Sequence, residues 1–282
     1  IMKTIQIISA LALVFFTAAS CESDDSEVLL DPLADLTKVQ TFKANDHSIE
    51  IYAAQQQFTI GYNELFIRIK EDATDAYIPN VQLSWSPVMH MTSKEHSCPK
   101  SEIVTTSDAN IAKGYIVFQM PGNADEYWDL KLDYTIENES FTVTERIEVQ
   151  SPPDGKKTIN TFMGTDNARY ILAMMPFNPE VKVNDFSAML FKMETMMSFP
   201  AVENYKINLD PRMPSMGNHS SPNNEDLSYK ANARMYSGKL SLTMTGYWKL
   251  NLKLENATGD LLKGEDITDT NESSSLFFEI EF

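Results

Sequence analysis

The chain has 282 residues, a formal net charge of −17 and a hydrophobic fraction of 43%. A protein this acidic is expected to avoid nucleic acid and anionic lipid surfaces, so we exclude nucleic-acid partners. After residues 1–20 the chain contains no apolar run of the roughly 20 residues that a membrane-spanning helix needs. At about 100–150 residues per domain, the length predicts two domains.

Residues 1–20 have the pattern of an export signal. Lys3 is followed by an apolar run from Ile7 to Phe16, and small residues stand directly before Cys21. This is the order of a signal peptide, and a cysteine at this place is what a lipobox requires. The stretch resembles the lipoprotein signals of the Bacteroidetes group, so we expect lipidation of Cys21 and a lipid anchor in the membrane. Cys98 is then the sole free cysteine, and no intrachain disulfide can form.

An acidic segment follows the predicted lipidation site. The cluster from Glu22 to Glu27 resembles the tags that send lipoproteins of this group to the outer face of the outer membrane. A solvated tether explains it equally well. Residues 22–45 lack sustained periodicity, so we predict an acidic tether over residues 21–45. The predicted location is the cell envelope; the outer membrane is favoured, and the choice between its periplasmic and surface faces is open.

The chain repeats itself at a spacing of about 120 residues. The matched segments are Val81–Met89 with Tyr205–Met213, His96–Pro99 with His219–Pro222, Gly114–Gly122 with Gly238–Gly246, and Tyr127–Leu132 with Tyr247–Leu252. So many matches in one order indicate a duplication. The turn-forming stretch from Pro152 to Lys157 marks the boundary between the copies.

Both copies alternate apolar and polar residues. The pattern is clearest in 128–132 and again in 248–254. A period of two is typical of a half-buried strand, and several short strands separated by turn signals indicate a β-sandwich. We therefore predict an all-β protein of two tandem immunoglobulin-like β-sandwich domains, residues 46–151 and 152–282. The apolar stretch 186–197 aligns with a strand region of the first copy, so we predict strand there and not helix.

A loop in the second copy carries soft metal ligands. It reads Met213-Pro214-x-Met216-x-x-His219, with prolines and a glycine that shape it. Thioether sulfur is a soft, uncharged donor that suits Cu(I), and imidazole also suits copper, whereas zinc prefers cysteine, histidine and carboxylate. Met213, Met216 and His219 are therefore predicted copper ligands. The alternative is a merely structural loop, since methionine is first of all a core residue.

The first copy offers Met89, Met91 and His96 in the same place. We predict them as a weaker second set of copper ligands, because the spacing differs from that of the second copy. His90 and Cys98 are the available substitutes. Cys98 would bind as a thiolate, or it is a small buried hydrophobe.

The loop Met213-Pro214-x-Met216-x-x-His219, followed by an apolar strand and then Tyr247-Trp248-x-Leu250, resembles the YtkA-like and FixH-like domain family. The resemblance covers most of each repeat in outline and is specific at Met213, Met216 and His219. It implies small exported or membrane-tethered β-sandwiches associated with copper handling and the assembly of respiratory oxidases. The first copy departs from the family pattern in the spacing of Met89, Met91 and His96.

The other methionines are predicted to be structural. Met120 and Met244 fall on the inward phase of their strands. The methionines without a histidine nearby in the sequence, predicted to lie in the core or at strand edges, are Met174, Met175, Met189, Met193, Met196 and Met197. No nucleophile elbow, phosphate-binding loop, dinucleotide fingerprint or HExxH motif occurs, so we predict that the chain is not an enzyme.

Together these features predict an envelope lipoprotein that binds copper, preferably Cu(I), for copper handling or delivery. Its partners would be a copper-dependent protein or an export system. The alternative is a tandem sandwich module of an envelope assembly that binds protein or glycan without metal. A partly exposed cluster of Met213, Met216 and His219 would favour the first function. Side chains that point apart or into the core would favour the second.

Overall fold

The structure, a computed structural model, describes residues 31–282. The chain divides into two units, Ile1–Ala34 and Asp35–Phe282. The predicted signal peptide, the lipidation site Cys21 and the acidic cluster lie outside the described residues. Within residues 31–282 no helix is long and apolar enough to cross a membrane.

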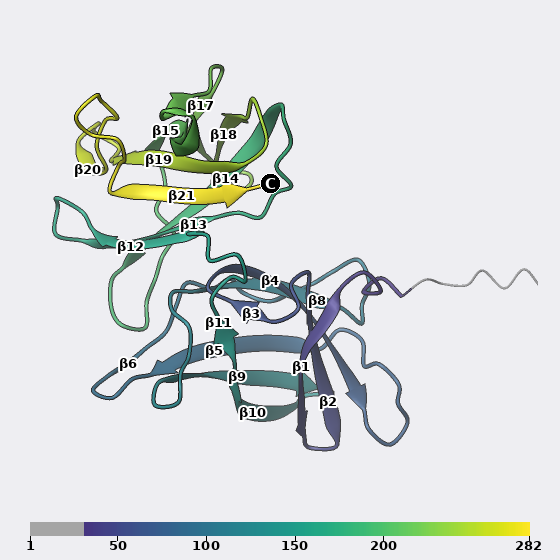
Figure 1. The fold of residues 1–282 in the computed structure, drawn as a ribbon. Helices are drawn as coiled ribbons and strands as arrows, with labels where there is room; N and C mark the ends of the chain where they lie inside the picture. The colour runs from purple at the N-terminus through teal and green to yellow at the C-terminus, as the bar shows by residue number, and fades with distance from the viewer. Residues whose placement is uncertain (1–30) are drawn as a thin grey trace, which may run out of the picture. The chain divides into compact units, whose positions relative to one another are not determined.

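The unit Asp35–Phe282 consists of β-strands and the loops that join them, apart from one short helix (Figure 1). Apart from the short 3₁₀ helix η1 (Pro214–Met216), every regular element in the described residues is a strand. The strands form two tandem immunoglobulin-like β-sandwiches, which confirms the fold class predicted from the alternation of apolar and polar residues.

The first sandwich has two main sheets, with strand orders β1-β2-β4-β8-β7 and β10-β9-β5-β6, and a short parallel pair of β3 and β11. Its strands are β1 (Thr37–Ala44), β2 (His47–Ala53), β3 (Phe58–Thr59), β4 (Gly61–Glu71), β5 (Gln82–His90), β6 (Glu95–His96), β7 (Val104–Thr105), β8 (Ala112–Phe118), β9 (Tyr127–Ile136), β10 (Glu139–Ile147) and β11 (Val149–Gln150).

The second sandwich is hydrogen-bonded along the path β12-β13-β14-β18-β17-β15-β19-β20, with β16 on β15 and β21 on β19. Its strands are β12 (Ile159–Met163), β13 (Arg169–Met174), β14 (Val183–Met193), β15 (Lys206–Met213), β16 (His219–Ser220), β17 (Glu225–Lys230), β18 (Met235–Ser241), β19 (Tyr247–Glu255), β20 (Leu261–Lys263) and β21 (Leu276–Glu281). β17 pairs with both β18 and β15 and so links the two layers.

The strand pairing repeats the duplication seen in the sequence. In the first copy β4 pairs with β8, and β5 pairs with β9 and β6. In the second copy β14 pairs with β18, and β15 pairs with β19 and β16. The stretch 186–197, predicted as strand, supplies most of β14 and the turn after it.

Each sandwich closes over its own apolar core. In the first, Ile49 and Leu65 from one sheet join Trp85 and Trp128 from the other, and all are at most 2% exposed. In the second, the side chains of β13 and β14 meet those of β15 and β19, including the fully buried Trp248. Large aromatic side chains dominate such cores because each one removes a large apolar area from water.

Equivalent glycines stand in β8 and β18, where neighbouring chain leaves no room for a side chain. A Cβ on Gly114 would lie 2.7 Å from the Trp85 ring, and one on Gly238 would lie 2.4 Å from the backbone oxygen of Glu225. Both distances are shorter than any ordinary contact. Close approach therefore explains why glycine occurs at this place in both copies.

The prediction of a tether through residue 45 is wrong for its last part. Residues Thr37–Ala44 form β1, which pairs with β2 from Thr37↔Ala53 to Ala44↔His47. Phe42 is the one fully buried side chain of this strand. A single strongly apolar position does not produce a detectable period of two, and the pairing with β2 supplies the order that the pattern lacks.

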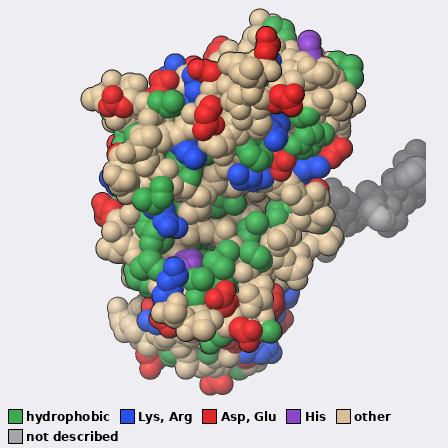
Figure 2. Space-filling view, turned by 60° about the vertical axis from the view of Figure 1, so that its left-hand side comes forward, with side chains coloured by type: hydrophobic (Ala, Val, Ile, Leu, Met, Phe, Trp, Pro, Cys, Tyr) green, Lys and Arg blue, Asp and Glu red, His purple; other side chains and the backbone are tan. Residues whose placement is uncertain are grey.

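The two sandwiches share a third apolar cluster within Asp35–Phe282. It joins Val117 of β8 to Ile159, Ile171, Met189 and Phe191 of the second sandwich. Figure 2 shows hydrophobic side chains gathered in the middle of the face that it displays, with charged groups spread above and below them.

Candidate functional site

A methionine and a histidine form a cross-strand pair at the same place in both sandwiches. Met89 at the end of β5 is the partner of His96 in β6, and Met213 at the end of β15 is the partner of His219 in β16. Directly opposite residues of an antiparallel pair have Cα atoms about 4.5–5.5 Å apart. The structure therefore brings together one predicted thioether and one predicted imidazole in each copy.

The predicted ligands of the second copy lie at different depths. Met213 is 3% exposed and belongs to the core, Met216 at the end of η1 is 57% exposed, and His219 is exposed. The expectation that Met213 lies in a loop is wrong, because it is the last residue of β15 and packs inward. Of these three predicted ligands, Met216 and His219 are the ones that solvent can reach.

The predicted ligands of the first copy lie closer to the interior. Met89 is fully buried in the core, Met91 is half-buried against it, and His96 is 7% exposed. The His96 ring meets Trp128 edge-on, with centroids 5.5 Å apart and planes at 89°.

Trp128 and its counterpart Trp248 make the same hydrogen bond in the two copies. Trp128 donates its Nε1–H to the backbone oxygen of Met120, and Trp248 donates its Nε1–H to that of Met244.

The hydrogen bond of His96 determines which ring nitrogen can bind a metal. Its Nδ1 lies 2.7 Å from the backbone oxygen of Ser97. A carbonyl oxygen only accepts, so Nδ1 carries the proton and Nε2 of the neutral ring presents its lone pair. Metal-binding histidines are typically held in this way, with the second nitrogen bonded to a carbonyl or a carboxylate.

The two substitutes considered for the first copy are poor ligands. His90 has Glu95 Oε1 at 2.9 Å from Nδ1 and Asp129 Oδ2 at 3.0 Å from Nε2, so both nitrogens are occupied. Cys98 is 2% exposed, and burial raises the pKa of its thiol well above the usual value, against a weaker opposing effect of Lys100. The thiolate that would bind a metal is therefore disfavoured.

The donor set of the described residues is soft. Between residues 31 and 282 no group of three or more histidine, cysteine, aspartate or glutamate side chains is placed to hold a metal ion. Thioethers and single imidazoles are the donors that the repeated site offers. Copper is the metal that such donors suit best.

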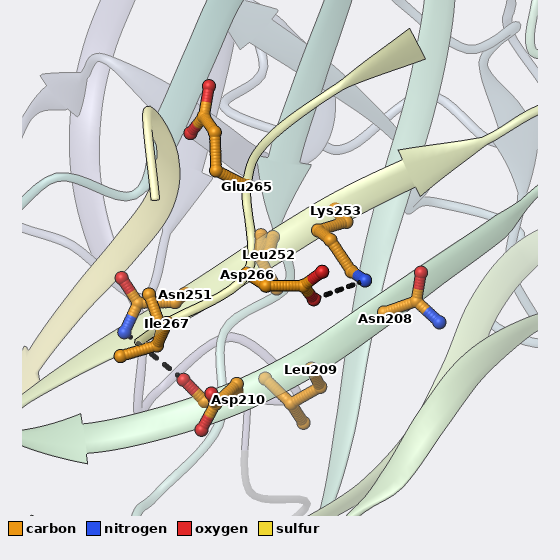
Figure 3. Close-up of a pocket in the computed structure, with 9 residues that line it drawn as sticks. All are labelled: Asn208, Leu209, Asp210, Asn251, Leu252, Lys253, Glu265, Asp266 and Ile267. Carbon is orange, nitrogen blue, oxygen red and sulfur yellow. Dashed lines mark hydrogen bonds and ion pairs between the residues drawn. The ribbon is translucent and has the colours of Figure 1, made fainter. Parts of the chain in front are cut away.

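A small pocket of about 210 Å³ lies on the second sandwich between β15, β19 and the segment after β20 (Figure 3). Its carboxylates are already partnered. Asp266 accepts a bond of 2.6 Å from Lys253 Nζ, and Asp210 accepts two bonds from Arg212, of 2.7 and 2.9 Å. The pocket is also smaller than the roughly 300 Å³ at which ligand sites begin, so we assign it no ligand.

A larger pocket of about 610 Å³ lies between the segment 54–62 and the linker after Gln150. Its lining includes Ile60, Tyr62, Pro152 and Met174, together with glutamine side chains. The side-chain oxygen of Gln55, at its wall, is buried and has no hydrogen-bond partner. Buried polar atoms are rarely left unsatisfied, so a hydrogen-bond donor such as a water or a ligand group is expected beside this oxygen.

Sequence reasoning named the methionines and histidines that pair across strands, but it missed their neighbours. The repeated Tyr-Trp segments were a visible signal, since Trp128 in β9 pairs with Met89, and Trp248 in β19 precedes Lys249, which pairs with Arg212. Nothing in the sequence indicated the pocket of about 610 Å³, because its lining comes from segments about 100 residues apart in the chain.

No known protein family matches this chain, and no curated protein matches it. Solved structures with some likeness include the Escherichia coli adhesin FdeC, at 14% identity and a TM-score of 0.24, over 80% of this chain and 64% of that one. A DUF4785 family protein from Legionella pneumophila has 10% identity and a TM-score of 0.26, over 78% and 56%. A titin A168–A169 fragment has 10% identity and a TM-score of 0.19, over 73% and 90%. This chain thus spans less than two thirds of the first two structures, and the scores are too low to carry an argument about function.

Proposed function

We propose that this chain is a lipid-anchored protein of the cell envelope that binds copper, preferably Cu(I), for copper handling or delivery. The observation that supports this function is the methionine–histidine pair that recurs at the same strand ends in both sandwiches. The first site would use His96 Nε2 with Met91 and Met89. The second would use His219 with Met216; Met213 packs into the core, which is the arrangement expected of the function without metal.

The chemistry of these donors suits the proposed metal. Thioethers stay uncharged at every pH, and they bind Cu(I) without first losing a proton. The His96 ring is held by the Ser97 carbonyl, so its lone pair has a fixed direction before the metal arrives. A fixed donor loses less conformational freedom on binding than a free one.

The proposed location follows from the predicted lipoprotein signal, and the proposed partners follow from the copper function. Lipidation at Cys21 would anchor the protein in the cell envelope, with the outer membrane favoured and the choice between its periplasmic and surface faces open. A copper-dependent protein or an export system would receive the metal. A role in binding, and not in catalysis, is proposed.

Titration of the full chain with Cu(I) against a chromogenic chelator tests this function. Replacing Met91 by leucine and His96 by glutamine, together with Met216 by leucine and His219 by glutamine, should weaken Cu(I) binding at least about tenfold, a loss of about 1.4 kcal/mol. Met89 and Met213 are left in place, because truncating a core methionine costs about 2–5 kcal/mol of stability.

Met163→Leu is the matched control for this titration, since Met163 in β12 is 48% exposed and belongs to neither site. It should bind Cu(I) as the unmodified chain does. Binding by the fourfold variant that is as tight as that of the unmodified chain would contradict the proposed function.

A second candidate function is supported by the pocket at Gln55. A glycan would fit it, because sugar hydroxyls are donors for the unpartnered Gln55 oxygen and a sugar face packs on a ring such as that of Tyr62. Burial and then the Glu64 carboxylate raise the pKa of Tyr62, so its hydroxyl stays protonated. The chain would then act as a glycan- or protein-binding module of an envelope assembly, without metal.

Saturation-transfer NMR with cellobiose, lactose and N,N′-diacetylchitobiose tests this second function. We expect transfer to at least one disaccharide, and binding of that disaccharide that is about two- to tenfold weaker in Gln55→Ala, because one hydrogen bond is worth about 0.5–1.5 kcal/mol. Gln82→Ala, at an exposed position of β5, is the control and should leave the signal unchanged. Equal signals from Gln55→Ala and the control would exclude this pocket as the glycan site.

A further inference from the structure

Two methionines occupy the tip of a tight turn that follows β14. Thr195 and Ser198 pair as an isolated bridge, Glu194 N donates to Ser198 O at 3.0 Å, and Met197 N donates to Thr195 Oγ1 at 3.1 Å. Met196 and Met197 are the residues between. Turn tips usually carry glycine, asparagine or aspartate, so a pair of thioethers there has no conformational explanation.

The exposure of this turn also lacks a structural explanation. Met197 is 55% exposed and Met196 is half-buried. Large apolar side chains grouped at the surface commonly mark a binding site. The sequence prediction that both methionines lie in the core or at a strand edge is therefore wrong for Met197.

The fold places this turn directly against the candidate site of the first sandwich. Ser97 N donates a hydrogen bond of 2.8 Å to the backbone oxygen of Met196. Ser97 directly follows His96 in the sequence. Met91 lies in the turn of the same hairpin, where its backbone N donates a hydrogen bond of 2.9 Å to Lys94 O. The backbone of a second-sandwich methionine is thus one residue away from the histidine of the first-sandwich pair.

We propose that Met196 and Met197 complete a Cu(I) site with His96 and Met91, so that both sandwiches supply ligands to one metal ion. This inference rests on the copper function proposed above and names further residues of its first site. Thioether sulfur from the turn and the Nε2 lone pair of His96 form a soft, uncharged donor set. The carboxylate of Glu194, held in the turn by Ser198 Oγ at 3.3 Å, adds a negative charge near the cation.

Met89 is the weaker candidate for this site because it is fully buried in the core, and a metal ligand needs an open path. Met91, Met196 and Met197 all keep some exposure. A metal bound there would join the β6 hairpin to the turn after β14 and so hold the two sandwiches together.

The test uses the full chain with Met216→Leu and His219→Gln, so that only the first site remains. Adding Met196→Leu and Met197→Leu should weaken Cu(I) binding at least tenfold in competition with the chromogenic chelator. Leucine keeps the volume and removes the sulfur, and such exchanges leave a fold intact. Adding Met163→Leu to the same background is the control and should change nothing.

X-ray absorption at the copper edge gives a second readout. The sulfur scattering should fall when Met196 and Met197 are replaced, and the nitrogen scattering of His96 should stay. If the background binds Cu(I) and the double replacement alters neither affinity nor sulfur scattering, the composite site is overturned while the copper function stands. If the unmodified chain binds no Cu(I), the copper function itself fails.

Discussion

Replacement of Trp248 by alanine is expected to lower the free energy of unfolding by about 3–5 kcal/mol. Trp248 in β19 is 0% exposed and lies in the core cluster of the second sandwich. Truncation leaves a cavity that the flanking strands cannot close, because β19 is held between β15 and β21. It also removes the Nε1–H donor of the bond of 3.0 Å to Met244 O.

Urea unfolding followed by circular dichroism measures this loss. Trp248→Phe is the matched variant; it keeps a buried ring and should cost less, about 1–3 kcal/mol. Trp128→Ala should cost as much as Trp248→Ala, since Trp128 is also fully buried and donates a bond of 2.9 Å to Met120 O. A loss below about 1 kcal/mol for Trp248→Ala would contradict the packing described for this core.

Replacement of Glu50 by glutamine is expected to cost about 3 kcal/mol at pH 7 and only about 1–2 kcal/mol at pH 3. The Glu50 side chain is 5% exposed and accepts bonds from Lys38 Nζ at 2.8 Å, Tyr52 Oη at 2.8 Å and Arg68 Nε at 3.2 Å. Burial alone would raise the pKa of Glu50, but the hydrogen bonds from Lys38, Tyr52 and Arg68 outweigh it and lower the pKa to about 2.

The sign of the pH effect follows from that shift. The pKa of an unfolded glutamate is about 4.3, above the folded value, so the stabilisation is fully present above pH 5 and is lost as the pH falls toward 2. Glutamine cannot titrate, and the difference between the two chains should therefore shrink on acidification. Unfolding in urea at pH 7 and pH 3 measures it.

The control for Glu50 is Glu64→Gln, because Glu64 is 49% exposed and its ion pair with Lys113 spans 3.9 Å. Exposed pairs contribute about 0–1 kcal/mol. A cost of Glu50→Gln that is the same at both pH values would show that the carboxylate is not held in its charged form by this network.

The strands predicted in both copies were confirmed where apolar and polar residues alternate along the sequence. Every second residue is buried from Trp128 to Tyr134 in β9 and from Trp248 to Leu254 in β19, as the alternation in the sequence indicates. A period of two is local, so a short window of sequence contains it. β1 escaped prediction because only Phe42 in it is fully buried.

The candidate site was predicted in part. The methionines and histidines were found by their chemistry, and the repeat aligned Met89 with Met213 and His96 with His219. That each methionine pairs with its histidine across two strands comes from the structure. Their depth was not predictable, since Met213 looks like a loop residue in the sequence and lies in the core. Nor could the sequence show that His90 already bonds to both Glu95 and Asp129.

The sequence by itself determines the internal duplication, the all-β fold class and the methionine and histidine donors, because each depends only on residue types and their spacing along the chain. Only the tertiary structure decides which donors meet. Met196 is about 100 residues from Ser97, and the bond between their backbones exists because two separately closed sandwiches pack through Val117 and Phe191. Such contacts depend on how whole layers pack, and no local period encodes that packing.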